Sequence, residues 1–404
     1  MNARYFHGVV VLLASALCAA PLAASQNPTT READATPVFP VHAFRAAARA
    51  VAPSVVTIET VGGTQPAAEL AGAAFMVADG PTTGLVWSSD GLILTSSFNF
   101  VRDPSVITVV LADGRRFVAE LLGRDEIRRL AMLAIDATDL PVPKWAASTD
   151  MKVGQWAISL GRGHGRQADV VVADAGGCTI TAGIISGLRR MSGLVIQTDA
   201  RLSPANFGAP LIDIAGRVLG LCVPMGMDGG QLSGVQWYDS GIGFAVPREQ
   251  VEIAAQQLAK GRDIRPGLLG VGLASPVPGA VFVAGCGDPS PALRAGIQPG
   301  DRIVAVNDQP VTGVAQLKRL IRPLGAGTRI VVHVERQGRK LELPLMLATR
   351  EDIGPISQPS PESEPESMPE SVPENEPREQ TPVEPMLPPD EDRTPVVPPA
   401  TGPA

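Results

Sequence analysis

Short apolar runs separated by turn residues fill the chain from Val55 to Val246. Residues 85–88 and 92–96 flank one Asp-Gly turn, and residues 107–111 and 116–122 flank a second. An Asp-Gly step between two β-rich runs is typical of a hairpin. Similar short runs follow at 130–135, 155–160, 179–186, 195–198, 210–213, 217–223 and 241–246. So many short strands and so few helices predict a mostly β fold built from antiparallel barrels.

Two helices are expected at the borders of this β-rich part. Residues 41–52 are rich in alanine and are followed by Pro53, which ends a helix. Residues 247–260 begin with proline, carry apolar residues at helical spacing and end before Gly261. The β-rich part and its flanking helices predict one domain over residues 41–262.

The first 25 residues have the pattern of an export signal. Residues 9–20 are apolar but too short to span a bilayer comfortably, and Ala23 and Ser25 are the small residues that a cleavage site needs. We expect cleavage after Ser25, a flexible lead-in over residues 26–40, and a location in the periplasm or cell envelope. A membrane anchor is the alternative.

The other end of the chain changes composition sharply. From Pro355 onward there are 11 acidic and 2 basic residues, and proline recurs every fourth residue between 361 and 377. Such a tract cannot bury a core, so we expect a disordered, acidic, Pro-rich tail over residues 351–404. A solvated spacer is favoured over a specific binding motif. Because the net charge of the whole chain is −7, the remainder is close to neutral, which argues against a nucleic-acid partner.

Three cysteines remain after the signal is removed: Cys178, Cys222 and Cys286. An odd number permits at most one internal disulfide, and the sequence does not say which pair it would join. Cys222 lies in an apolar run and is expected in the core. Because the cysteines form no CxxC pair, we expect no metal site and no cofactor.

One stretch, VIQTDARLSPANFGAPLI at residues 195–212, resembles the nucleophile loop of the HtrA/Deg family of trypsin-like serine proteases. The positions that match the family are Gln197, Thr198, Asp199, Ala200, Pro204, Asn206, Gly208, Pro210 and Leu211. The resemblance implies a trypsin-like double β-barrel. It also implies that Phe207 stands at the position of the family's serine nucleophile.

The other two positions of the family's catalytic triad also differ in this chain. By resemblance, Phe98 or Asn99 stands where the family has its histidine, and Arg129 stands where it has its aspartate. A phenyl ring has no lone pair to attack a carbonyl and no proton to pass on. The expectation is therefore that the chain has no catalytic residues of the usual kind and is not an enzyme. Ser203 and His164 are the alternative catalytic groups.

Residues 263–350 resemble a PDZ domain through GLLGVGL at 267–273 and SPALRAGIQPGDRIVAVNDQPV at 290–311. Residues 313–324 are the expected groove helix. Such domains usually bind an extended C-terminal peptide as an additional strand. The residues expected to bind the peptide are Leu268, Leu269, Gly270, Val271, Leu317, Leu320 and Ile321. Leucines on the helix could equally be core residues.

Together these features predict an exported HtrA-like pseudoprotease that binds C-terminal or unfolded peptides through its PDZ domain. It would act as a scaffold or as a regulator of active relatives. The family resemblance makes a trimer or another homo-oligomer plausible. Two alternatives remain: a serine-type endopeptidase with non-standard catalytic residues, and a holdase chaperone in envelope protein quality control.

Overall fold

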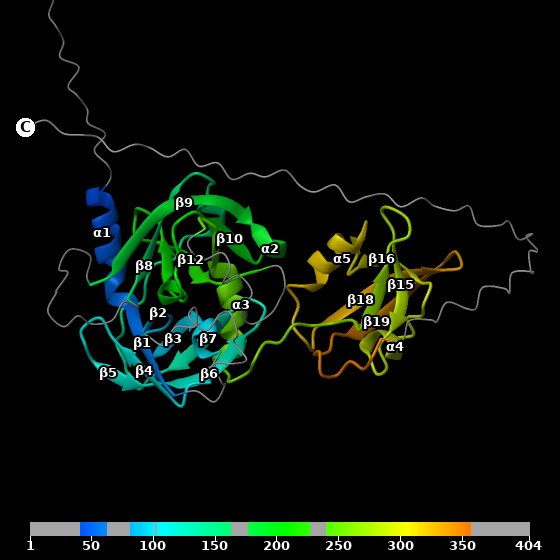
Figure 1. Ribbon diagram of the computed structural model, residues 1–404, viewed down its shortest axis with the longest axis horizontal. Coiled ribbons are helices and arrows are strands. Elements are labelled where there is room, and N and C mark those ends of the chain that lie inside the picture. The colour runs from blue at the N-terminus through cyan, green and yellow to red at the C-terminus, as the bar shows by residue number, and fades with distance from the viewer. Residues whose placement is uncertain (1–40, 63–80, 102, 163–176, 227–239, 357–404) are drawn as a thin grey trace, which may run out of the picture. The chain divides into compact units, whose positions relative to one another are not determined.

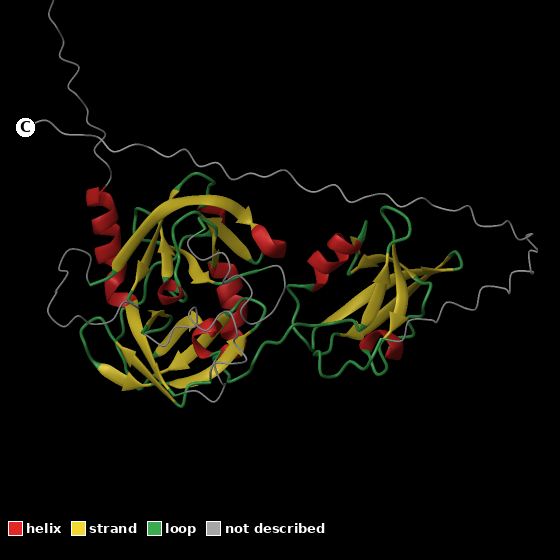
Figure 2. Cartoon of the chain, in the orientation of Figure 1, coloured by secondary structure: helices red, strands yellow, loops and turns green. Residues whose placement is uncertain are grey.

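The computed structural model describes residues 41–62, 81–101, 103–162, 177–226 and 240–356. The expected signal peptide, lead-in, His164 and most of the expected tail lie outside these residues. None of the described helices is both long and apolar enough to cross a membrane. Figure 2 shows that strands greatly outnumber helices in the described chain. The structure confirms the prediction of a mostly β fold.

The first barrel sheet has seven strands in the order β5-β4-β1-β2-β3-β7-β6. Its strands are β1 (Val55–Val61), β2 (Thr82–Val86), β3 (Leu92–Ser96), β4 (Val106–Val110), β5 (Arg116–Val118), β6 (Glu120–Asp125) and β7 (Leu130–Ala134). The two expected Asp-Gly hairpins are the β2–β3 and β4–β5 connections, both antiparallel. Helix α1 (Val41–Val51) and a 3₁₀ turn (Ala52–Ser54) lead into β1.

The second barrel is closed, with the strand order β10-β13-β12-β11-β8-β9. Its strands are β8 (Trp156–Gly161), β9 (Thr179–Arg189), β10 (Val195–Thr198), β11 (Pro210–Ile212), β12 (Val218–Val223) and β13 (Gly243–Val246). The short α2 (Arg190–Gly193) joins β9 to β10, and 3₁₀ turns lie at Ser97–Phe100, Ser148–Asp150 and Pro204–Asn206. Helix α3 (Arg248–Leu258) follows β13 and packs on β6 and β7 (Figure 1).

Each barrel has its own apolar interior, and a third cluster lies between them. Ile58 and Val109 belong to the interior of the first barrel, and Leu211 and Cys222 to that of the second. Residues from both barrels, from α1 and from α3 form the cluster between them. Because side chains alternate along a strand, each strand can contribute one face to a barrel interior and the other to the shared cluster.

Cys178, Cys222 and Cys286 are all buried, and none of them forms a disulfide. Cys222 is fully buried inside the second barrel, as expected for a small core residue. Burial raises the pKa of its thiol to about 12. The thiol therefore stays protonated at neutral pH and contributes packing rather than nucleophilic chemistry.

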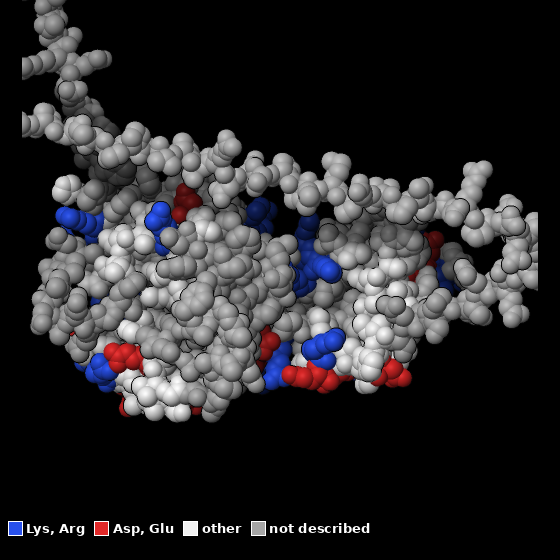
Figure 3. Space-filling view, in the orientation of Figure 1, with Lys and Arg blue, Asp and Glu red and all other residues white. Residues whose placement is uncertain are grey.

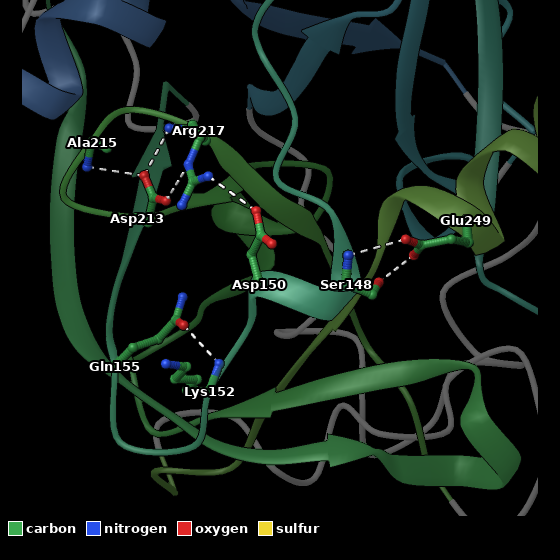
Figure 4. A network of polar contacts seen from close by, with 8 residues as sticks. All are labelled: Ser148, Asp150, Lys152, Gln155, Asp213, Ala215, Arg217 and Glu249. Atoms are coloured by element: carbon green, nitrogen blue, oxygen red, sulfur yellow. Dashed lines mark hydrogen bonds and ion pairs between the residues drawn. The ribbon is translucent and has the colours of Figure 1, made fainter.

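A polar network ties the loops at one end of the second barrel (Figure 4). Arg217 donates to the carboxylates of Asp213 (2.8 Å) and Asp150 (3.3 Å). Ser148 donates its N–H and its hydroxyl to Glu249 at the start of α3. Burial raises the pKa of Glu249, but the hydrogen bonds from Ser148 outweigh this and hold the pKa below its ordinary value. Ion pairs this exposed contribute little stability, so the network mainly fixes loop positions.

The PDZ domain has its own sheet in the order β14-β15-β16-β18-β19, and β17 pairs with β16. Its strands are β14 (Val271–Ala274), β15 (Val281–Cys286), β16 (Arg302–Val306), β17 (Gln309–Pro310), β18 (Arg329–Arg336) and β19 (Arg339–Met346). Its helices are α4 (Pro291–Arg294) and α5 (Val314–Ile321), so the groove helix is shorter than the expected 313–324. A separate apolar cluster, which includes Val281, Ile303 and Val332, forms its core.

Lys and Arg side chains are interspersed with Asp and Glu side chains on the face shown in Figure 3. On that face, the described residues form no extended surface of a single sign. This agrees with the nearly neutral charge of the chain outside its acidic end.

Candidate functional site

Three segments that are far apart in sequence contact one another in a region that we call the barrel centre. They are the 3₁₀ turn after β3, the turn before β7 and the loop before β11. They carry Phe98, Arg129 and Phe207 respectively. The rings of Phe98 and Phe207 pack edge to face, with centroids 5.2 Å apart and an interplanar angle of 83°. Both rings are almost fully buried. The structure thus brings together two positions that the sequence analysis singled out separately.

Asn99 links the first segment to the third. Its side-chain nitrogen donates to Thr95 Oγ1 (2.8 Å) and to the carbonyl oxygen of Phe207 (3.1 Å). Its amide oxygen is buried and has no hydrogen-bond partner among the described residues. An amide has no pKa near neutrality, so this side chain can position the loop but cannot exchange a proton with a substrate.

Arg129 joins the same centre through its backbone. Its carbonyl oxygen accepts hydrogen bonds from the N–H of Ser97 (2.9 Å) and from Ser96 Oγ (3.2 Å). Its φ of 60° places it in the left-handed region, which non-glycine residues rarely adopt. The side chain is buried, and burial lowers the pKa of the guanidinium. Arg129 therefore holds the turn before β7 against the turn after β3.

Asp125, a carboxylate four residues before Arg129, has a different neighbourhood. It is fully buried, and its Oδ1 accepts the N–H groups of Ile127 (2.8 Å) and Arg128 (3.0 Å). Its Oδ2 pairs with the Arg128 guanidinium at 3.0 Å, and Arg128 in turn donates to Gln250 on α3. This carboxylate is saturated by structural partners, which agrees with a role in fixing the β6–β7 turn.

The loop before β11 directs its backbone donors inward. The N–H of Asn206 donates to Ser203 O (2.8 Å), and the N–H of Phe207 donates to Pro204 O (3.2 Å). The hydroxyl of Ser203 donates to Asn206 Oδ1 at 2.7 Å. An oxyanion hole needs N–H groups that point at the developing charge. In this conformation the amides of Asn206 and Phe207 already have partners within their own turn.

Gly208 is required by the geometry of this loop. Its φ is 96°, and a Cβ added there would lie 2.2 Å from both the carbonyl oxygen of Thr83 and the Oγ1 of Thr95. No side chain fits such a space. The positive φ and this close approach together explain why position 208 is a glycine.

The PDZ domain contains a groove beside β14. Strand β14 is the edge strand of its sheet, so one side of it pairs with β15 and the other has no neighbouring strand in the described chain. Leu268, Leu269, Gly270 and Val271 line the groove, as do Leu317 and Ile321 on α5. Leu320 does not line it and instead packs against the PDZ core.

The loop that precedes β14 leaves two backbone donors available. Leu268 exchanges hydrogen bonds with Ala348, but the N–H groups of Leu269 and Gly270 donate to no acceptor among the described residues. Gly270 has φ 76°, and a Cβ there would lie 2.5 Å from the Cβ of Ser290. This glycine is therefore needed both for its conformation and for the approach of α4.

Two groove residues come from a segment that the sequence analysis assigned to the tail. The described chain continues to Ile356, and both Ile353 and Ile356 line the groove. Pro355 O accepts the N–H of Asp288 (3.3 Å), and Gly354 N–H donates to Pro289 O (2.9 Å). In the sequence, these two isoleucines are the one feature that indicates packing of this segment, because they interrupt a polar, Pro-containing stretch.

Comparisons with known proteins give matches for both the barrel part and the PDZ part of the chain. Residues 82–221 match the trypsin-like peptidase domain family, and residues 283–336 match the PDZ domain family. The chain is 33% identical over 281 residues to the "Probable periplasmic serine endoprotease DegP-like" of Chlamydia trachomatis, covering 65% of this chain and 53% of the relative. It is 30% identical over 299 residues to HhoA of Synechocystis sp., provisionally named a serine protease, covering 67% of this chain and 71% of the relative.

Solved structures show the same fold. The serine endoprotease from Yersinia pestis matches with a TM-score of 0.56 and 27% identity, over 76% of this chain and 97% of that protein. The HtrA-type protease AlgW with tripeptide matches with a TM-score of 0.56 and 26% identity, over 78% and 98%. The chain spans about half the length of the DegP-like relatives that it matches.

One expectation from the sequence is contradicted by these comparisons. The sequence analysis expected a protein that is not an enzyme, whereas the similar proteins are named serine endoproteases, and these names point to a protease. The expectation rested on the residues at the three triad positions, whereas the comparisons extend over both barrels and the PDZ domain.

Proposed function

The chain belongs to the HtrA/Deg family of trypsin-like proteins with a PDZ domain, and from this premise we propose that it captures the ends of peptide chains in its PDZ groove. An extended peptide would add to the open edge of β14 as a further strand. Its terminal carboxylate would accept the N–H groups of Leu269 and Gly270, and its last side chain would contact Leu317 and Ile321. The two available N–H groups beside an open strand edge carry this proposal.

A binding measurement tests this function. The full chain is titrated against a fluorescent peptide with an apolar last residue and against the same peptide with an amidated end. Hydrogen bonds to a charged acceptor contribute about 1.5–3 kcal/mol, so amidation should weaken binding at least about tenfold. Equal affinity for the two peptides would contradict capture of a free carboxylate.

We place the protein in the periplasm or cell envelope. Support comes from the export pattern of the first 25 residues and from the relatives named as periplasmic. Amino-terminal sequencing of the secreted chain would test the expected cleavage after Ser25. An uncleaved amino terminus would favour the anchor.

For the barrel we propose that Phe98 or Asn99, Arg129 and Phe207 occupy the positions of the family triad. Phe98 packs on Phe207, Asn99 donates to Phe207 O, and Ser96 and Ser97 donate to Arg129 O; these contacts support the assignment. The test is to superpose a crystal structure of this chain on the structure of an active relative. Displacement of any of the three from the relative's triad by more than one residue would contradict it.

A second candidate function is endopeptidase activity with non-standard catalytic residues, and the names of the relatives favour it. Ser203 is the hydroxyl closest in sequence to Phe207, but its partner Asn206 cannot take up a proton. His164, the other candidate group, lies outside the described residues. Endopeptidase activity predicts that the purified full chain cleaves unfolded casein and that Ser203→Ala or His164→Ala abolishes the cleavage. Cleavage unaffected by both changes, or none by the parent chain, would contradict this candidate.

A further inference from the structure

The PDZ residues that line the groove combine an apolar surface with basic side chains. Leucine, isoleucine and valine side chains form most of it, and Lys318, Arg322 and Arg350 supply the charge. Within residues 263–356, no aspartate or glutamate lines the groove. The PDZ surface of this groove is therefore positively charged, although the chain as a whole carries a net charge of −7.

Two of these cations have no counter-ion among the described residues. Lys318 and Arg350 are exposed and form no ion pair with any described residue. The third, Arg322, donates to the carbonyl oxygen of Gly226 at 3.0 Å. Lys318 lies on α5, next to Leu317, whereas Arg350 lies after β19. Two separate elements thus bring an available positive charge to the same groove.

The carboxylates closest to Arg350 in sequence are already bound to other groups. Glu351 pairs with Arg265 at 2.7 Å. Asp352 accepts the N–H of Thr349 (3.1 Å) and its hydroxyl (2.6 Å). These hydrogen bonds hold the pKa of Asp352 below its ordinary value. Both carboxylates beside Arg350 therefore contact other groups, and Arg350 forms no ion pair with a described residue.

We infer that the groove selects C-terminal peptides of partner proteins that have an apolar last residue and acidic side chains upstream of it. This inference rests on the proposed capture of peptide ends and adds its specificity. The carboxylates of the peptide would face Lys318 and Arg350. Exposed ion pairs contribute modestly, so each cation should improve binding by about two- to fivefold, and salt should weaken that part of the affinity.

The test compares two fluorescent peptides of equal length with the same apolar last residue and a free carboxyl end. One carries glutamate at three upstream positions, and the other carries glutamine there. The full chain should bind the glutamate peptide about tenfold more tightly at low salt, and high salt should reduce this ratio. Lys318→Gln and Arg350→Gln should each lower the affinity for the glutamate peptide about two- to fivefold and leave the glutamine peptide unchanged.

Lys340→Gln is the matched control, because Lys340 is exposed on β19 and does not line the groove. It should leave the affinity for both peptides unchanged. A loss equal to that of Lys318→Gln would mean that overall charge decides binding, and would overturn the inference. A third probe, residues 361–377 of this chain blocked at both ends, is acidic without a free carboxyl end. If it bound as tightly as the glutamate peptide, selection of acidic peptide ends would also be overturned.

The outcomes separate the inference from the function on which it rests. If amidation abolishes binding but the glutamate and glutamine peptides bind equally, peptide capture stands and acidic selection fails. If amidation has no effect on either peptide, capture of peptide ends fails as well. If both amidation and the glutamine replacements weaken binding, the inference and the function are both supported.

Discussion

The barrel centre and the PDZ groove use their backbone donors in opposite ways. At the barrel centre the N–H groups of Asn206 and Phe207 donate within their own turn, and the Phe98 and Phe207 rings fill the space beside them. In the PDZ groove the N–H groups of Leu269 and Gly270 have no acceptor among the described residues, and the strand edge is open. Satisfied donors and buried rings stabilise a fold, whereas available donors bind a ligand.

This comparison assigns different effects to substitutions in the two regions. Changes at the barrel centre should act mainly on the free energy of unfolding, and changes in the groove mainly on affinity for peptides. Substitutions of Phe207 and Gly270 test that separation, and Asp301 tests the stability of the PDZ domain outside the groove; the largest expected effect comes first.

Removing the ring of Phe207 should strongly destabilise the protein. The side chain is 4% exposed and packs against Phe98, and truncating a buried phenylalanine costs about 3–5 kcal/mol. Phe207→Ala should lower the free energy of unfolding by that amount in urea titrations. Val118→Ala is the control, since Val118 is 77% exposed and should change stability by less than about 0.5 kcal/mol. A loss below about 1 kcal/mol for Phe207→Ala would show that the ring is not packed as described.

The PDZ domain should lose stability in acid through Asp301. Burial opposes its charge, but hydrogen bonds from Arg336 and from the N–H of Gln298 outweigh burial and hold the pKa of Asp301 below 3.8. A carboxyl group whose pKa is lowered on folding stabilises the folded state above its unfolded pKa. That stability is lost as the pH falls from about 3.8 through the lower folded value. Hydrogen bonds of this charged kind contribute about 1.5–3 kcal/mol.

The measurement is the free energy of unfolding of the full chain between pH 2 and pH 7, followed with a probe in the PDZ domain. Asp301→Asn should lower stability at neutral pH and flatten the acid-dependent part of the curve. Asp308→Asn is the control, because Asp308 is 95% exposed and its effect should be small. If Asp301→Asn left the curve unchanged, the Asp301–Arg336 pair would not contribute to the pH dependence.

Gly270→Ala should weaken peptide binding about tenfold, which corresponds to about 1.4 kcal/mol. The added Cβ would meet Ser290 and would have to adopt a φ of 76°, so the loop with the available N–H groups must shift. Gly296→Ala shares the positive φ of 84° but has open space around it. If both variants weakened binding equally, the backbone strain of a positive φ would be responsible, and not a shift of the loop that carries the available N–H groups.

Much of the fold could be predicted from local patterns. The two Asp-Gly hairpins, the helix that ends before Gly261 and the limits of β10 all follow from short stretches of sequence. Turn residues act on their immediate neighbours, so their effect can be read along the chain. The end of the PDZ domain could not be predicted in this way. Residues 353–356 are compatible with a tail, and only their contacts with Pro289 and the groove show otherwise.

The sequence by itself determined which residues are available for chemistry. It determined that Phe207 and Arg129 occupy their loops, that a PDZ domain follows the barrels, and that acidic residues concentrate at one end. Only the tertiary structure decided that Phe98 and Phe207 pack against each other and that Leu320 lies outside the groove. It also decided that Lys318 and Arg350 share one groove without a counter-ion among the described residues. Residue type is a property of single positions, whereas packing, hydrogen-bond direction and charge pairing depend on distances between segments that the chain brings together only when it folds.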